Sequence, residues 1–198
     1  MRHPLEKLTR RGVAWSVLAA SLAVSVWLGV KAGGDGRLTL RDGTSQGVIY
    51  LELAGSAGRA AEVIDVWREH YLVGAAREAV VYDFFFIPFY ATNLALCCLM
   101  AGRVLGRGRR RLAAAGVVLA WGQWLAGAFD ALENVAMLRM LGAGATEFWA
   151  RWCWLFAALK FAILVEGSLY ALAGLAVWIV GNLRAHGPRP HRSLDEPA

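Results

Sequence analysis

A group of polar side chains interrupts one long apolar stretch of this chain. The stretch covers residues 112–138, which is long enough to cross a membrane as a helix, and it contains Asp130, Glu133 and Asn134. An ionised side chain in the middle of a membrane-spanning helix costs roughly 2.5 to 3.5 kcal/mol of insertion free energy, even on lenient scales. These side chains therefore need a polar interior to face, and further helices must provide it.

The composition of the chain favours a membrane protein. Hydrophobic residues make up 58% of the 198 residues, and they occur in four long blocks. Most of the net charge of +6 lies in short basic segments that flank these blocks, where Lys and Arg set the orientation of a membrane protein. No basic soluble domain is left once the blocks are removed, so we expect the lipid bilayer as a partner and no nucleic acid.

The four blocks predict an all-α protein, a bundle of four transmembrane helices that forms a single membrane domain over residues 1–183. The first block has about 18 apolar residues and no clear cleavage site after it, so we expect an uncleaved span and not a signal peptide. The predicted spans cover residues 13–31, 79–101, 112–138 and 154–181.

Basic residues in the short loops predict that the N- and C-termini are cytoplasmic. Four lie in the N-terminal segment, five in residues 103–111 and three in the C-terminal tail, against two in the connection between the third and fourth spans. We expect a multi-pass protein of a bacterial inner membrane. The tail, residues 184–198, contains three prolines and is expected to be disordered.

The long connection over residues 32–78 is then extracytoplasmic, and two of its parts carry local signals. Alternating residues between Leu38 and Leu53 fit a short hairpin or a pair of extended pieces. Ser56 fits the N-cap of an amphipathic helix from residue 57 to about 72, which Gly74 would end. This helix forms either a lid on the bundle or a helix in the headgroup layer, and its scarcity of Lys and Arg favours the lid.

Polar residues recur at matching depths on the second, third and fourth spans. At about 1.5 Å of rise per residue, Asp130 and Lys160 lie at one depth, about 13 Å below the outer arginines. We expect these two to form an ion pair, and Asp83 to pair with Asn134 or Tyr82. The residues expected to line a pocket are Asp83, Tyr90, Asn93, Trp124, Asp130, Glu133, Asn134, Lys160 and Glu166.

Polar residues become sparse toward the cytoplasmic half of the predicted spans. This pattern favours a pocket that opens outward over a channel. Four carboxylates inside the spans also exceed what one lysine can pair, which favours a small or lipid-like ligand. An enzyme that uses acid–base chemistry on a lipidic substrate is the catalytic form of this hypothesis.

The alternative is a structural or assembly subunit. Its buried polar pairs would only fix how the helices pack, and its outer loop would dock a membrane-protein partner or a second copy of the chain. A metal bound by carboxylates is a third alternative. However, all four histidines lie outside the spans, and Cys97, Cys98 and Cys153 form no redox motif or ligand set. We therefore expect no metal and no cofactor.

Two segments resemble those of a group of small bacterial integral membrane proteins with four spans. Tyr82–Tyr90 reads Y-D-F-F-F-I-P-F-Y and contains D-F-x-F-I-x-x-Y, and Asp130–Asn134 reads D-A-L-E-N and matches D-x-x-E-N. With Leu51–Ala54 and Trp67, the resemblance covers about residues 48–138 and implies a fold. The layout is also similar, in topology only, to the emopamil-binding and sigma-2 receptor class, which binds sterol-like amines in an intramembrane cavity.

Overall fold

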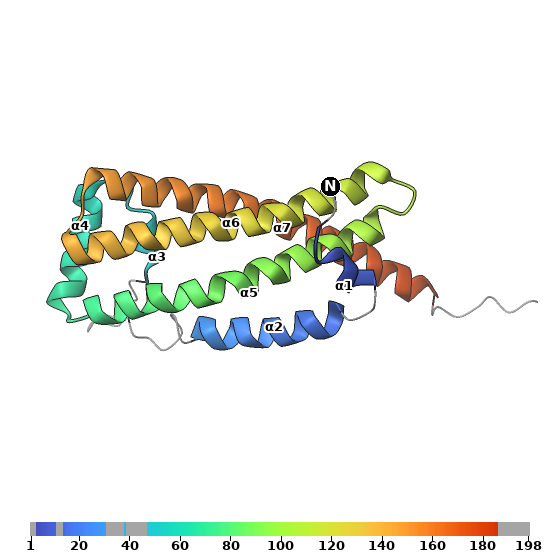
Figure 1. The fold of residues 1–198 in the computed structure, drawn as a ribbon, viewed down its shortest axis with the longest axis horizontal. Coiled ribbons are helices and arrows are strands. Elements are labelled where there is room, and N and C mark those ends of the chain that lie inside the picture. The colour runs from blue at the N-terminus through green and yellow to red at the C-terminus, as the bar shows by residue number, and fades with distance from the viewer. Residues whose placement is uncertain (1–2, 11–13, 31–37, 39–46, 186–198) are drawn as a thin grey trace, which may run out of the picture.

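In the computed structural model, residues 3–10, 14–30, 38 and 47–185 are described, and the regular elements within them are helices (Figure 1). Three long helices run side by side, and a shorter apolar helix packs on the first of them (Figure 1). Three short helices lie at the two ends. The elements are α1 (Glu6–Arg10), α2 (Ala14–Gly29), α3 (Ile49–Glu52), α4 (Ala57–Glu69), α5 (Val73–Leu105), α6 (Arg110–Ala143) and α7 (Glu147–Ala185).

The three long helices, α5, α6 and α7, are long and apolar enough to cross a membrane. They contain the predicted spans 79–101, 112–138 and 154–181 and extend beyond them at both ends. The first predicted span, 13–31, corresponds to α2, which has 16 residues and falls just below the usual length of a spanning helix. The all-α prediction is confirmed and the long helices indicate a bilayer environment, whereas a fourth crossing by α2 stays a prediction.

Glycines allow the long helices to approach closely at one end of the bundle. A Cβ atom on Gly116 of α6 would lie 2.8 Å from the Cys98 carbonyl oxygen of α5 and 2.9 Å from the Cα atom of Gly102. A Cβ atom on Gly174 of α7 would likewise collide with Ala101 of α5. Small residues at such crossings allow backbones to pack in direct contact, which is how helices associate in lipid.

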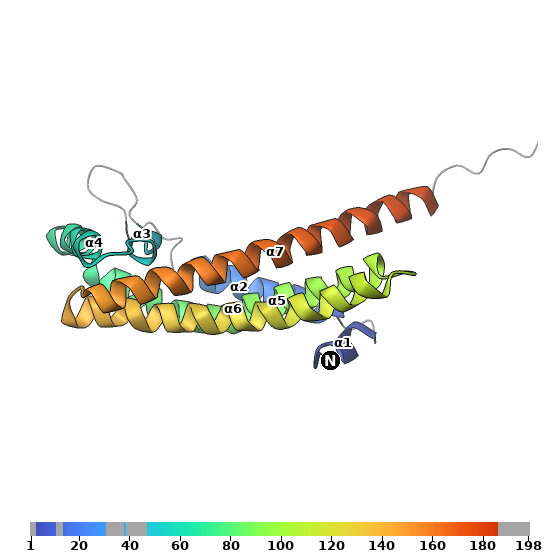
Figure 2. The same cartoon turned by 90° about the horizontal axis from the view of Figure 1, so that it is seen from above.

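Beyond Gly174, α7 diverges from the other long helices. Figure 2 shows its C-terminal part leaving α5 and α6, and residues 175–184 are all exposed. This segment is almost entirely apolar as far as residue 180. An exposed apolar helix with few protein neighbours is stable in lipid and not in water, so this segment is suited to a bilayer.

The opposite end of the bundle is covered by α4. Ser56 accepts a hydrogen bond from the backbone N–H of Arg59 at 3.4 Å, so the predicted N-cap is confirmed. The apolar face of α4, which includes Ile64 and Trp67, is buried against α5 and α7. The Glu147 carboxylate at the start of α7 accepts a hydrogen bond from the Ala57 N–H at 2.9 Å. The amphipathic helix therefore packs on the bundle, as the lid alternative requires.

Two local predictions around α4 are wrong. Residues 49–52 form the helix α3 and not a strand, because a helical turn buries Leu51 and Glu52 together on one side. Of the other predicted extended piece, Leu38–Leu40, only Leu38 is among the described residues. Gly74 lies inside α5, and the turn after α4 occurs at Tyr71, which takes the left-handed conformation with φ of 59°. There the Leu72 N–H donates to the Trp67 carbonyl at 2.7 Å, which closes the helix end.

The predicted disordered tail also needs a correction at its start. The helix α7 continues to Ala185, so the first two residues of the predicted tail are helical. The rest of the tail, residues 186–198, lies outside the described residues.

The contact at Gly116 generates the first prediction. Gly116→Ala should reduce the free energy of unfolding by about 1–3 kcal/mol relative to Gly142→Ala, because the added methyl group overpacks backbone atoms at position 116 and meets open space at position 142. Both substitutions lie in α6, so the gain in helix propensity cancels in the comparison. Thermal unfolding in detergent micelles, followed by Trp fluorescence, measures the difference. Equal melting temperatures would show that α5 and α6 do not depend on this close contact.

Candidate functional site

One ammonium group lies among three carboxylates between the long helices. The Lys160 Nζ atom of α7 is 2.9 Å from Asp130 Oδ1 and 2.9 Å from Glu133 Oε2, both on α6. It is also 3.6 Å from Glu52 Oε2 on α3. All four residues are buried. The predicted Asp130–Lys160 ion pair is confirmed, and by formal charge the acids outnumber the cation three to one.

The hydrogen bonds around this cluster hold Asp130 on both of its oxygens. Lys160 donates to Asp130 Oδ1 at 2.9 Å, and the Tyr90 hydroxyl donates to Asp130 Oδ2 at 2.6 Å. Lys160 also donates to Glu133 Oε1 at 3.0 Å, while Glu133 Oε2 has only the electrostatic contact. Asp130 is thus bonded to two other helices, which fixes the spacing of α5, α6 and α7.

A second polar pair lies beside the cluster. The Asn134 side-chain amide donates to Asp83 Oδ2 at 2.8 Å, so Asn134 and not Tyr82 is the partner of Asp83. Within the described residues, the buried Oδ1 atom of Asn134 has no hydrogen-bond partner. An unsatisfied buried acceptor carries a desolvation cost, which a donor from a ligand or water could remove.

The local sequence explains why these side chains meet. Asp130, Glu133 and Asn134 are spaced i, i+3 and i+4, so they share one face of α6. Asp83 and Tyr90 are seven residues apart on α5, which is close to two helical turns. Each set therefore forms a stripe on its own helix, and helix packing brings the two stripes together.

A cavity of about 650 Å³ opens beside the cluster. Part of its wall is polar and part is apolar, and the ends of α2 and α3 contribute to its rim. The polar residues on its wall are Glu52, Asp83, Tyr90, Asp130, Asn134, Lys160 and Ser168. Large apolar side chains on its wall are Phe86, Leu94, Met137, Phe161 and Leu164. The arrangement can hold a molecule that has both a charged group and an apolar part.

The structure places four of the predicted pocket residues elsewhere than on the cavity wall. Glu133 lies close to the cavity, since it binds Lys160, but it is not one of the residues that line it. Asn93 faces α2, where it accepts a hydrogen bond from the Ser21 hydroxyl and donates to Ser25 Oγ at 3.1 Å. Asn93 is only three residues from Tyr90 on α5, but hydrogen bonds with the α2 serines turn its side chain toward α2.

Trp124 and Glu166 lie apart from the cavity for different reasons. Trp124 contacts the His3 ring near α1, with ring centroids 4.7 Å apart. Burial lowers the pKa of His3, which favours its neutral ring. Glu166 is exposed on α7 and has no partner within the described residues. It is six residues from Lys160, and six steps along the helix leave the two side chains about 240° apart in the direction of rotation. The two therefore cannot share a face of α7.

Glu52 is a site residue that the sequence reasoning did not select. It stands in the loop outside the predicted spans, and only packing of α3 on α6 and α7 brings it to Lys160. The sequence around Glu52 could have indicated its burial, because a lone carboxylate between Leu51 and Leu53 is unusual for a solvated loop.

No metal site is present in the part of the chain that the structure describes. No group of three or more His, Cys, Asp or Glu side chains is arranged to hold a metal ion there. The Lys160 ammonium fills the space between the carboxylates, where a cation would otherwise bind.

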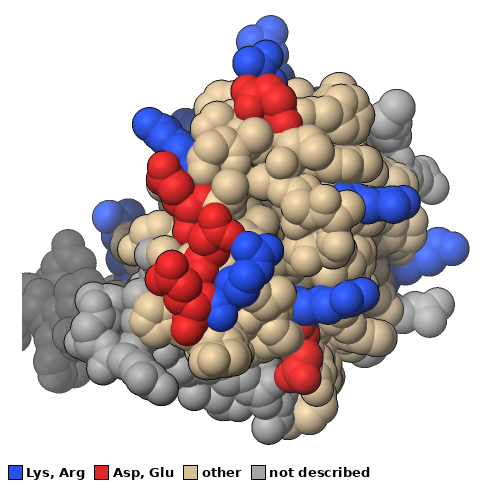
Figure 3. All heavy atoms as spheres, turned by 90° about the vertical axis from the view of Figure 1, so that its left-hand side faces the viewer, with Lys and Arg blue, Asp and Glu red and all other residues tan. Residues whose placement is uncertain are grey.

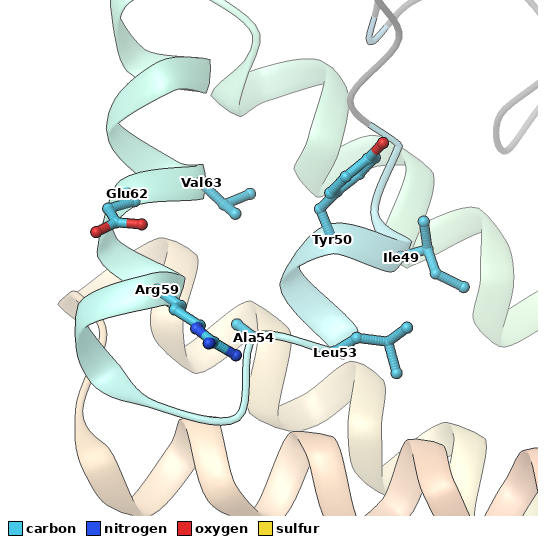
Figure 4. Close-up of a pocket in the computed structure, with 7 residues that line it drawn as sticks. All are labelled: Ile49, Tyr50, Leu53, Ala54, Arg59, Glu62 and Val63. Atoms are coloured by element: carbon cyan, nitrogen blue, oxygen red, sulfur yellow. The ribbon is translucent and has the colours of Figure 1, made fainter.

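The surface at the α4 end differs from the buried cluster. Acidic and basic side chains lie next to one another on it (Figure 3), and ion pairs there include Arg68 with Asp65 and Arg151 with Glu147. A hollow of about 380 Å³ lies between α3 and α4, and side chains such as Tyr50 and Val63 line it (Figure 4). The hollow and these ion pairs belong to the surface and are separate from the group of carboxylates around Lys160.

Comparison of the chain with protein-family models, curated proteins and solved structures finds no match.

The charge balance of the cluster generates the second prediction. Lys160→Met should lower the free energy of unfolding by about 3–5 kcal/mol, because it leaves buried carboxylates without their cation. Arg151→Met is the matched control: it breaks an exposed ion pair on the same helix and should cost about 0–1 kcal/mol. Unfolding by SDS in mixed micelles measures both. A Lys160→Met protein as stable as Arg151→Met would mean that the carboxylates do not depend on the ammonium.

Proposed function

We propose that this integral membrane protein binds a small amphiphilic ligand with a positive charge in the cavity beside Lys160. The excess of buried acid supports the proposal most directly. Asp83 lines the cavity, and within the described residues its only hydrogen bond comes from the neutral amide of Asn134. Lys160 already faces three other carboxylates. A cationic group in the cavity would therefore complete the charge balance at Asp83.

The size and walls of the cavity fit such a ligand. Its volume of about 650 Å³ lies within the roughly 300–1,000 Å³ of small-molecule sites. Phe86 and Phe161 line it near the polar residues. Aromatic rings attract cations through their faces and also accommodate apolar groups, so one ligand can satisfy both kinds of wall.

The distribution of charge along α5 supports a position of the cavity near one membrane boundary. No charged residue lies between Asp83 and Arg103, and the 19 residues 84–102 span about 29 Å, close to the hydrocarbon thickness of a bilayer. With the arginine-rich connection cytoplasmic, the cavity lies at the extracytoplasmic side. An amphiphile in that leaflet could place its charged group at Asp83 and its apolar part beside Leu94 and Leu164.

Asp83→Asn tests this proposal. Decylamine should stabilise the wild-type protein in detergent by about 2.7 kcal/mol at a concentration of 100 times Kd, and Asp83→Asn should abolish the effect by removing the negative charge. The variant should keep its own melting temperature, because the Asn oxygen can still accept from Asn134. Differential scanning fluorimetry measures the shifts.

Two controls separate binding in the cavity from unspecific effects of an amphiphile. Glu166→Gln removes one negative charge outside the cavity and should leave the decylamine shift intact. Decanol and decanoate have the same chain length without the positive charge and should stabilise less. If decanol acts as strongly as decylamine, or if the Asp83→Asn protein responds like wild type, the proposal is wrong. An acid–base enzyme on a lipidic substrate would be the catalytic form of the same site.

A role as an assembly subunit is the second candidate, and Glu166 favours it. This carboxylate is exposed on the apolar helix α7 without a partner in the described part of the chain. A carboxylate that faces lipid is costly, so a basic or polar group on a second copy or another membrane protein would stabilise it.

Native mass spectrometry from detergent tests the assembly role. If it is correct, wild-type protein forms a complex larger than one chain, Glu166→Gln dissociates that complex, and Asp83→Asn leaves it intact. A single chain in all three samples would exclude an assembly that depends on Glu166.

A further inference from the structure

A second cavity extends from the neighbourhood of Leu94 and Ser168, which also line the cavity beside Lys160, to the arginine-rich end of the bundle. It has a volume of about 610 Å³ and lies where α7 diverges from the bundle (Figure 2). Its walls come mainly from α2, α5 and α7. Apolar side chains such as Leu18, Leu94, Met100 and Leu172 dominate its lining. We call this cavity the inner cleft.

Basic groups lie at the α1 end of the inner cleft. Arg103 and Arg107 are exposed and contribute to its lining, and no acidic residue does. The Arg103 guanidinium donates to the backbone carbonyl of Thr9, which is neutral and leaves the positive charge uncompensated. In the described part of the chain, Arg107 has no partner. The apolar cleft thus ends at two positive charges that no acidic residue in the described part of its lining compensates.

Two tryptophans mark the depth of this end in the membrane. Trp15 of α2 and Trp178 of α7 contact each other across the inner cleft, with ring centroids 6.2 Å apart. Tryptophans in membrane proteins are enriched at the headgroup level. The arginines at the same end are therefore in position to meet lipid phosphates, while the leucines face the acyl region.

We propose that the inner cleft binds an anionic phospholipid, with one acyl chain between α2 and α7 and the phosphate at Arg103 and Arg107. Arginine recognises phosphate through paired N–H donors, and basic pockets between membrane helices hold anionic headgroups. A neutral lipid or a second copy of the apolar α7 would fill the cleft without compensating the two charges. The site is independent of the function proposed for the Lys160 cavity.

Lipid retention by the full-length protein tests this site. Protein in detergent is mixed with phosphatidylglycerol or phosphatidylcholine of identical acyl chains, and native mass spectrometry gives the dissociation constant of each adduct. We expect phosphatidylglycerol to bind more tightly to wild type. Arg103→Gln with Arg107→Gln should weaken it about 30-fold, from roughly 1 kcal/mol for each arginine, and weaken phosphatidylcholine binding less, because the choline cation already balances the phosphate of that lipid.

A charge-matched control pair and a variant that fills the cleft make the test specific. Arg109→Gln with Arg110→Gln removes the same charge from the same connection outside the cleft lining and should keep the preference for phosphatidylglycerol. Leu172→Trp should fill the cleft and weaken binding while both arginines remain. Equal binding of the two lipids by wild type would indicate a neutral occupant and overturn the proposal. Equal losses in the two arginine pairs, or full binding by Leu172→Trp, would also overturn it.

Discussion

The ammonium of Lys160 holds together a group of carboxylates that an apolar bundle could not otherwise bury. Removing an ion from water costs several kcal/mol, and only close opposite charges and hydrogen bonds offset that cost. Asp130 binds Lys160 on one oxygen and the Tyr90 hydroxyl on the other, so α5, α6 and α7 meet at one point. Glu52 joins the same ammonium from α3, which ties the connecting segment to the long helices.

Among the described residues, the polar side chains between the helices form separate groups. Asn93 is engaged by the serines of α2, and the Gln123 side chain donates to the Ile163 carbonyl of α7 at 3.2 Å. Toward the arginine-rich end, Gly102 and Gly116 bring α5 and α6 into backbone contact. The charged cavity and the apolar inner cleft adjoin at Leu94 and Ser168, but carboxylates line the first and arginines lie at the far end of the second, so each is suited to a different class of amphiphile.

The prediction from sequence succeeded for the pairing of Asp130 with Lys160 and for part of the facing. Matching these two residues required only the helical rise and the positions of nearby arginines, and the ion pair is present. The prediction failed for Asn93 and Trp124, because the direction of a side chain around the bundle axis depends on which neighbour packs there. Asn93 meets α2, and Trp124 meets His3.

The sequence by itself determined the three long apolar helices, the cap at Ser56 and the stripe of Asp130, Glu133 and Asn134, because these follow from periodicity and local hydrogen bonds. Only the tertiary structure decided that residues 49–52 are helical and that Glu52 reaches Lys160, since that outcome depends on packing of α3 against distant helices. Both cavities are likewise tertiary features, because each is lined by residues of helices that lie far apart in the sequence.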